Sequence, residues 1–436
     1  MMQEFWFEIL SFTVLQSLLS AALSVVLGGG LARFLFAYRG SFFERPLIAL
    51  GNLTFVMPAT IPALAFLILF EDLYGLGGIV CVHVFLNAMY CMTQVRGGYE
   101  RLISPQQEKQ AALLGLKFWE RFFFLELPAL SHTLKNSFLV VFCLCLSSFS
   151  VVLLMGGGPA STTLSVALYH ALTVTIDAQD ISFFLGVQIV VSLIAAFLLS
   201  SKKESPGKKK STSKVKEIFQ PRPLPLTGNL FLGSLFLLYL FPFFTLVTSF
   251  SLTAGRLHGL VKSVVLTVVM GTVVGIITVG GGLALLTFYL YKRKDFTKAF
   301  VMGITIFLSF PKIVLISGVF LLAYESLDDL TFSYSLILFV SVICYLPFVL
   351  KSFLGDFEHF QRTYRHSFSL LRLGFLDIFY SLVGAVLKGK IRGKIAMLTC
   401  FSMGNLTVPL LLGQMDVETL RSKTRKRHIV QARQLA

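Results

Sequence analysis

The most restrictive feature of the sequence is a series of apolar segments, each long enough to cross a lipid bilayer as a helix. A bilayer core about 30 Å thick requires roughly 20 apolar residues per helical crossing. The apolar residues are continuous rather than alternating with polar ones, which argues against a transmembrane β-barrel. The sequence therefore predicts an all-α polytopic membrane protein with about ten transmembrane helices. We place them at residues 9–32, 47–70, 77–95, 136–155, 181–200, 228–250, 263–290, 299–322, 331–349 and 393–412.

The distribution of charge predicts the orientation of these helices. Only 14% of the residues are charged, against about 25% in soluble domains. If the N-terminus lies outside, most Lys and Arg residues fall in loops on the inner side, which follows the positive-inside rule. The net charge of +16 then serves topology and contact with anionic lipid headgroups, and no nucleic-acid partner is expected. One segment does not fit: the basic residues at 421–433 would lie outside, unless a re-entrant element returns the chain or the last span is misplaced.

The two sides of a basic segment resemble each other, which predicts an internal repeat. Residues 201–227 are rich in Lys, Ser and Pro, so we interpret them as a cytoplasmic linker between a first half (1–200) and a second half (228–436) with a basic tail. The recurring glycine helix crosses in the same direction in both halves, which predicts parallel repeats with a pathway at their interface. Four landmarks recur in order, separated by 252, 253, 259 and 257 residues: glycine triplets 28–30 and 280–282, Pro58 and Pro311, Gly115 and Gly374, Gly156 and Gly413.

A polar, helix-prone stretch interrupts the apolar pattern on the inner side. Ser104 followed by Pro105 is typical of a helix start. Gly115 either ends this helix or lets another backbone approach closely, because glycine is costly inside a helix. An aromatic run follows, and we expect Pro128 to turn the chain toward the next span. These features predict a short amphipathic helix that lies across the inner face and docks into a groove on another protein.

The stretch resembles the EAA loop of ABC-importer permeases, in which E-A-A-x-x-x-G is followed, after nine residues, by I-x-L-P. Lys109 stands at the Glu position of that pattern and Gln110 at its first Ala, while Glu108 is displaced by one residue. The second copy of the loop keeps Gly374 but is otherwise degenerate. The resemblance implies that the loop couples to an ATPase through Glu108, Lys109, Ala111, Ala112, Gly115, Leu125, Leu127, Pro128 and, in the second copy, Gly374.

A narrower resemblance follows the loop. Residues 147–172, with a serine pair, a GGGP sequence and a threonine pair, are similar to thiamine and thiamine-pyrophosphate permeases of the fused two-half type. The resemblance implies the type I ABC importer permease fold, a periplasmic binding protein and two copies of a cytoplasmic ATPase docking on residues 106–116 and 361–375. It also implies residence in the bacterial inner membrane. Relative to this family, both ends of the chain are expected to be short.

The chain is not expected to be an enzyme or to bind a cofactor. Residues 384–390 approach a Walker A sequence, but Ile391 stands where Ser or Thr would bind Mg²⁺, and no strand precedes it. ATP and Mg²⁺ are therefore expected on the partner ATPase. The His and Cys residues lack the spacing of metal ligands, and no catalytic constellation is evident.

Several polar or helix-breaking residues within the spans are candidates for the substrate pathway. Lys312 is the one Lys or Arg that we place at mid-membrane, where charge is costly and suggests function. It would favour a phosphorylated or anionic substrate; misplacement of the span or snorkelling of its side chain is the alternative. The other candidates, for which helix packing is the alternative role, are Pro58, Pro311, Ser147, Ser148 and Asn405.

The predicted function is that of the membrane subunit of an ATP-driven importer for thiamine or thiamine pyrophosphate. A fused permease for iron(III) or another small solute is the alternative within the class. An ion-coupled secondary transporter is the alternative from a different class. It would require carboxylates within the spans, and we identify none at mid-span.

Overall fold

The computed structural model describes most of the chain as α-helices, and the described residues contain no β-strand. Among the described residues, six helices are long and apolar enough to cross a membrane, and four shorter apolar helices accompany them. The predicted all-α polytopic membrane fold is confirmed. The described residues are 2–37, 42–70, 72–175, 178–200, 225–249, 254–291, 300, 303–304, 307, 312–323, 330–371, 374–381, 388–405 and 407–412.

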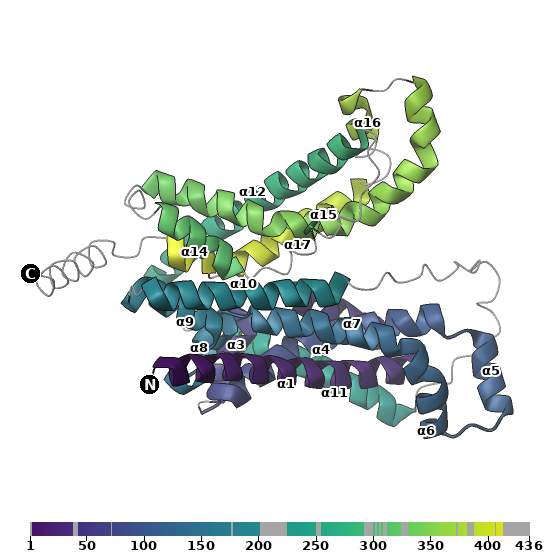
Figure 1. Ribbon diagram of the computed structural model, residues 1–436. Helices are drawn as coiled ribbons and strands as arrows, with labels where there is room; N and C mark the ends of the chain where they lie inside the picture. The colour runs from purple at the N-terminus through teal and green to yellow at the C-terminus, as the bar shows by residue number, and fades with distance from the viewer. Residues whose placement is uncertain are drawn as a thin grey trace, which may run out of the picture. The chain divides into compact units, whose positions relative to one another are not determined.

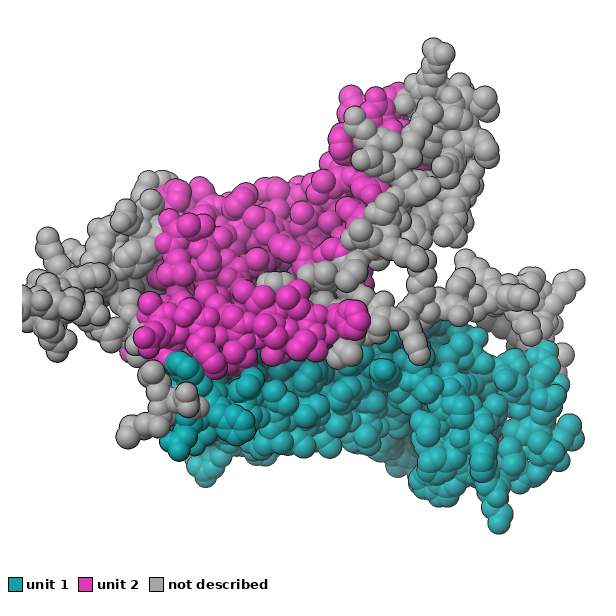
Figure 2. Space-filling model, in the orientation of Figure 1, with its two compact units in different colours: residues 1–163, 198–251 teal, residues 164–197, 252–436 magenta. Residues whose placement is uncertain are grey.

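Contacts divide the chain into two compact units, which Figure 2 colours separately. Unit 1 comprises residues 1–163 and 198–251, and unit 2 comprises residues 164–197 and 252–436. The units differ from the halves predicted in the sequence, since α10 (Ala178–Ser200) falls mostly in unit 2 and α11 (Leu226–Ser249) in unit 1. Unit membership follows packing, whereas the predicted halves follow chain order and stay a prediction.

Unit 1 is built around α1 (Met2–Ala37), which packs along α4 (Gly75–Leu102) and α7 (Leu127–Leu146) (Figure 1). Membrane helices lack a hydrophobic drive to associate and instead pack closely through small residues. Gly28 provides such a contact, because a Cβ atom there would lie 2.3 Å from the carbonyl oxygen of Ala88 on α4. The outer layer comes from α2 (Glu44–Val56), α3 (Thr60–Leu69) and α11, which packs on both of them.

Unit 2 has a comparable core. Its long helices are α12 (Ala254–Tyr291) and α15 (Leu330–Leu371), and α17 (Lys388–Met403) packs against α12. Buried apolar residues join the three helices, among them Leu283, Phe353 and Leu398. The other helices that the structure describes in this unit are α9 (Leu164–His170) with the π-helix η3 (Ala171–Thr175), α10, α14 (Lys312–Ala323), α16 (Phe375–Ser381) and α18 (Thr407–Leu412).

Three predicted spans are wrong as single helices. The segment 47–70 divides into α2 and α3 because the residue before a proline avoids helical geometry, and Met57 is extended ahead of Pro58. The segment 136–155 divides into α7 and α8 (Ser150–Met155), and the segment 393–412 divides into α17 and α18. The predicted span 331–349 is only part of α15, and much of 299–322 lies outside the described residues.

The helix breaks strengthen the case for an internal repeat. The helices α7 and α17 end at Leu146 and Met403, which are separated by 257 positions. The helices that follow, α8 and α18, begin and end at the same separation. Backbone hydrogen bonds also correspond, since Ser148 N donates to Cys145 O and Asn405 N to Ser402 O, both at 3.2 Å. This part of the repeat therefore runs without insertions.

Candidate functional site: the coupling loop and the helix breaks

The loop between α4 and α7 begins with the predicted helix, α5 (Pro105–Leu113). Its start is fixed by a capping box in which the Ser104 hydroxyl accepts from Gln107 N and the Gln107 side chain accepts from Ser104 N. Its end is fixed by Gly115, whose φ of +66° is costly for residues with a Cβ atom. No atom lies within 4 Å of a Cβ built on Gly115, so this glycine ends the helix and does not admit another backbone.

The return arm of the loop is continuous with α7. It consists of α6 (Phe118–Arg121) and the π-helical turn η1 (Phe122–Glu126), which leads directly into α7. The expectation that Pro128 turns the chain is wrong, because Pro128 is the second residue of α7. A proline in a helix loses one hydrogen bond and clashes with the carbonyl four residues earlier. The wider π-turn immediately before it, where Leu127 N donates to Phe122 O, accommodates this defect.

A cluster of charged residues holds the loop against the membrane helices. Glu126 is only 2% exposed, and its carboxylate accepts hydrogen bonds from Arg33 Nε at 2.5 Å and from Tyr99 Oη at 2.9 Å. Arg121 Nε lies 2.9 Å from the other oxygen of Glu126. A second nitrogen of Arg121 lies 3.5 Å from Glu108 on α5, which is 6% exposed. We call these five residues the loop anchor.

An aromatic contact reinforces the loop anchor. The Arg33 guanidinium lies 3.6 Å from the centre of the Phe118 ring, and it also donates to the Phe118 carbonyl at 3.3 Å. Arginine stacks on aromatic faces more readily than lysine because its planar cation is weakly hydrated. Arg33 of α1 therefore binds both the first and the last residues of the return arm.

The predicted coupling residues of α5 lie on two different faces of the helix. Glu108 and Ala111 face inward and are buried, whereas Lys109 and Ala112 are exposed. Ala111 and Ala112 therefore do not share one surface, and the Glu108 carboxylate contacts Arg121. Among the residues of the return arm, Leu125 and Leu127 are half-buried and Pro128 is exposed.

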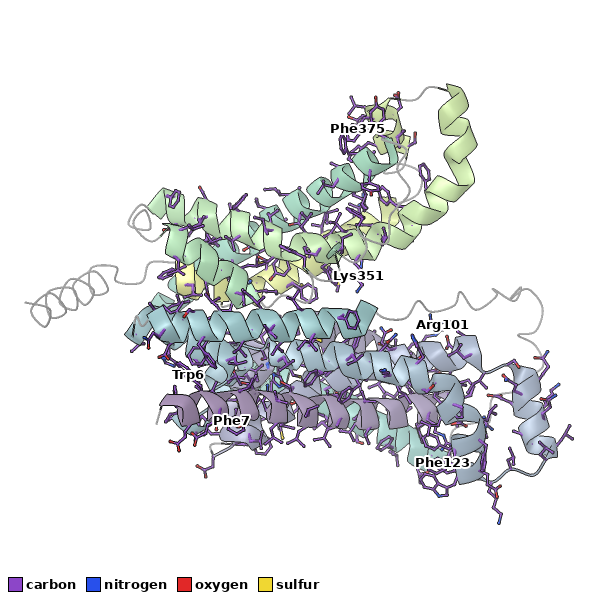
Figure 3. The ribbon with its side chains drawn as sticks, viewed as in Figure 1. Trp6, Phe7, Arg101, Phe123, Lys351 and Phe375 are labelled. Carbon is purple, nitrogen blue, oxygen red and sulfur yellow. The ribbon has the colours of Figure 1, made fainter. Side chains whose placement is uncertain are left out.

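Large apolar side chains lie on the outward side of the loop. Leu113 is 88% exposed and Leu114 is 75% exposed, and Phe118, Trp119 and Phe124 are also exposed. The loop helices lie together at one end of unit 1, beyond the end of α1 (Figure 1). Figure 3 shows Phe123 and Arg101 at this end, and Trp6 and Phe7 at the opposite end. We call the outward side of α5 with Leu113 and Leu114 the docking face.

The residues that correspond between the two copies of the loop differ from those predicted from the sequence. In the first copy, Lys117 precedes α6 and its N–H donates to Glu120 at 2.8 Å. In the second, Gly374 precedes α16 and its N–H donates to Asp377 at 3.0 Å. Gly374 thus corresponds to Lys117, at the same separation of 257 positions as the helices that follow. The predicted pairing of Gly374 with Gly115 is wrong by two positions.

The second copy also lacks the charges of the loop anchor at two corresponding positions. Ile378, which is buried in the apolar core of unit 2, corresponds to Arg121. Val383 corresponds to Glu126 in the sequence and lies outside the described residues. For residues 361–371 the structure describes the backbone alone, as the end of α15.

The predicted pathway residues Ser147, Ser148 and Asn405 lie at corresponding helix breaks. Ser147 and Ser148 separate α7 from α8, and Asn405 separates α17 from α18 at the position that corresponds to Ser148. Discontinuous helices at matching places in two repeats are typical of substrate sites in transporters, because unwound backbone is tolerated where it lines a cavity. Pro58 lies at a further break, between α2 and α3.

A buried hydrogen-bond chain, which sequence reasoning missed, reaches the first break. His83 on α4 lies with Nε2 2.9 Å from Ser148 Oγ and Nδ1 3.3 Å from Ser20 Oγ on α1. Ser20 belongs to a fully buried polar stripe on α1 that also includes Gln16, whose side chain donates to the Cys145 carbonyl at 3.1 Å. The polar residues of α1 thus connect with the end of α7.

Lys312 is placed at the start of α14, and its neighbour Pro311 lies outside the described residues. The Lys312 side chain is exposed, and Nζ lies 3.4 Å from Tyr345 Oη and 4.4 Å from the centre of its ring. The Tyr345 hydroxyl donates to the Phe401 carbonyl at 2.8 Å, close to the second helix break. The geometry thus combines a cation and an aromatic ring beside a discontinuous helix.

Comparison with known proteins identifies relatives over most of the chain. A thiamine transport system permease protein ThiP of Haemophilus influenzae is 26% identical over 447 residues, covering 95% of this chain and 81% of the relative. ThiP of Brucella abortus is 26% identical over 370 residues, covering 78% and 67%. ThiP of Salmonella typhimurium is 32% identical over 222 residues, covering 46% and 41%. No family model matches the chain, and no solved structure matches it. These similarities confirm the family resemblance and the expected multi-pass location in the bacterial inner membrane.

Proposed function

We propose that this chain, an ABC transporter permease of the bacterial inner membrane, carries thiamine or thiamine pyrophosphate inward at the expense of ATP hydrolysed by a separate subunit. The observation that supports this proposal most directly is the docking face. Exposed leucines beside a helix end are costly in water, so a protein partner is the natural cover for them. The similarity to thiamine transport permeases along 95% of the chain supports both the class and the substrate.

The partners follow from this role. Two copies of a cytoplasmic ATPase would dock, one on residues 106–116 and the other on residues 361–375 around the second loop. ATP and Mg²⁺ would be bound by the ATPase. A periplasmic binding protein would deliver the substrate at the opposite side of the membrane. ATP binding would switch the pathway from inward-facing to outward-facing.

The Lys312–Tyr345 pair suggests how the two substrates could be distinguished. A lysine ammonium attracts a phosphate group and disfavours a bare organic cation. The aromatic ring beside it offers a surface for stacking a planar ring. We therefore propose that the pyrophosphate ester is the preferred substrate and that Lys312 faces its phosphates in the pathway.

Replacing Lys312 by methionine is expected to lower uptake of labelled thiamine pyrophosphate about tenfold, which corresponds to the loss of about 1.4 kcal/mol. Uptake of unphosphorylated thiamine should stay within twofold of its original rate. Lys312→Arg is the matched control, because it keeps the charge and should keep most of the pyrophosphate uptake. Unchanged uptake of thiamine pyrophosphate by Lys312→Met would remove the proposed role.

The function itself is tested by reconstitution in lipid vesicles. The purified chain is combined with the candidate ATPase and binding protein, and accumulation of labelled thiamine and thiamine pyrophosphate is measured with and without ATP. Uptake that requires both ATP and the ATPase is expected. Uptake without the ATPase would indicate an ion-coupled transporter. ATP-dependent uptake of iron(III) or another solute, with no uptake of thiamine or thiamine pyrophosphate, would overturn only the proposed substrate.

A further inference from the structure

The loop anchor joins elements that are distant in the chain. Glu126 contacts Arg33 of α1, Tyr99 of α4 and Arg121 of the return arm, and Arg121 extends the contact to Glu108 of α5. The docking face therefore connects to two membrane helices through charged and polar contacts centred on a single carboxylate.

Because the Glu126 carboxylate is buried, its contacts resist separation of the elements that they join. Removing one member of a buried ion pair leaves an uncompensated charge, which is strongly destabilising. The exposed fraction of Glu126 is 2%, so its carboxylate cannot exchange protein donors for water without opening the loop. If α5 or the return arm moves, Arg33 and α1 are therefore expected to move with it. Separating the return arm from α1 would leave the buried Glu126 carboxylate without Arg33 as its ion-pair partner. Arg33 also lies five positions after Gly28, where α1 touches α4.

The second loop lacks this arrangement at the positions that can be compared. Its short helix α16 packs on α12 through apolar contacts, including the ring pair Tyr291–Phe375 at 6.3 Å. Ile378 occupies the position of Arg121 and is buried among apolar residues. Apolar packing tolerates small sliding movements more easily than an ion pair, because dispersion is not directional.

We propose that Glu126 is a positioning residue that transmits movement between the docking face and α1, so that the first loop couples through charge and the second through apolar packing. This inference rests on the proposed function. It assigns to Glu126, Arg33 and Arg121 a role in coupling ATP hydrolysis to transport rather than in binding the ATPase, since Glu126 is buried and none of the three belongs to the docking face.

The test is Glu126→Gln in the full complex of the chain, the ATPase and the binding protein in vesicles. The measured quantity is the number of ATP molecules hydrolysed per labelled thiamine or thiamine pyrophosphate molecule accumulated. We expect this ratio to rise about tenfold while the ATPase copurifies in the original stoichiometry. The matched control is Glu100→Gln, which removes an exposed charge that pairs with Arg96 on the same helix. That variant should leave the ratio within twofold.

Two further variants separate coupling from folding. The single variant Arg33→Leu removes the contact with α1 while Glu126 keeps Arg121 and Tyr99 as partners, and it should raise the ratio as Glu126→Gln does. The double variant Arg33→Leu with Glu126→Leu removes both charges without stranding either. It should keep the complex folded, as judged by copurification and thermal unfolding, and still raise the ratio.

The inference is overturned if folded Glu126→Gln and Arg33→Leu/Glu126→Leu complexes couple normally. It is equally overturned if the ATPase fails to copurify with a folded Glu126→Gln chain, because Glu126 would then be needed for binding. Absence of ATP-dependent uptake by the unaltered chain is a different result, and it would refute the proposed function itself.

Discussion

Replacing Leu113 and Leu114 by aspartate is expected to abolish ATPase binding at the first loop and to reduce ATP-dependent uptake more than tenfold. Each leucine contributes about 1.5 kcal/mol or more when buried by a partner, so losing both weakens docking about a hundredfold. The chain itself should remain folded, because both side chains are exposed. Copurification of the ATPase and the thermal unfolding midpoint in detergent measure the two effects separately.

The control uses an equivalent change at the other end of unit 1. Phe5 and Phe7 are also exposed apolar residues, and Figure 3 shows Phe7 at the opposite end from the loop. The double variant Phe5→Asp with Phe7→Asp should retain the ATPase. Equal retention of the ATPase by both double variants would show that α5 does not dock it.

Gly28→Ala is expected to destabilise the chain by about 3 kcal/mol, near the upper end of what overpacking usually costs. The added Cβ would lie 2.3 Å from the carbonyl oxygen of Ala88 and 2.6 Å from the Cβ of Cys91. Backbone cannot move aside as a flexible side chain can, so α1 and α4 must separate along their contact. Thermal unfolding in detergent measures the loss.

Gly30→Ala in the same helix is the matched control and should change stability in the opposite direction. No atom lies within 4 Å of a Cβ built on Gly30, and alanine is favoured over glycine in a helix by about 1 kcal/mol. Similar stabilities for the two variants would refute the close approach of α1 to α4.

The apolar pattern predicts the fold class well, but it does not predict where helices break. A continuous apolar run satisfies the length requirement for a span whether or not the helix is interrupted. The break at Pro58 has a local cause that the sequence contains, since proline restricts the residue before it. The break at Ser148 has no proline beside it, whereas Asn405 lies four residues before Pro409, whose ring would clash with the Asn405 carbonyl in a continuous helix.

The prediction of the coupling loop rests on a local sequence pattern, and it is correct for the local features of the loop. Ser104 and Gly115 bound α5 as expected, because capping and positive φ are properties of the nearby chain. The inward direction of Glu108 could not be predicted, because it depends on Arg121 and Glu126 folding back from beyond the helix. An acidic residue within the apolar run before Pro128 was the available signal for Glu126.

The predicted correspondence between the two repeats is wrong where it is based on residue identity alone. Gly115 and Gly374 are both glycines beside a loop helix, but one ends α5 and the other precedes α16. The glycine triplets show the same effect. Gly28 makes the close contact in unit 1 and Gly282 makes it in unit 2, where a Cβ would lie 2.7 Å from a side-chain carbon of Val349. The close contact therefore lies at the first glycine of one triplet and at the third glycine of the other.

The central claim is that the docking face on α5 binds the ATPase. It is tested most directly by placing a photoreactive benzoylphenylalanine at position 113, with the same residue at position 7 as the control, in membranes that contain the whole transporter. Irradiation is predicted to link the ATPase to position 113 and not to position 7. Absence of a link from position 113, or an equal yield from position 7, would contradict the account.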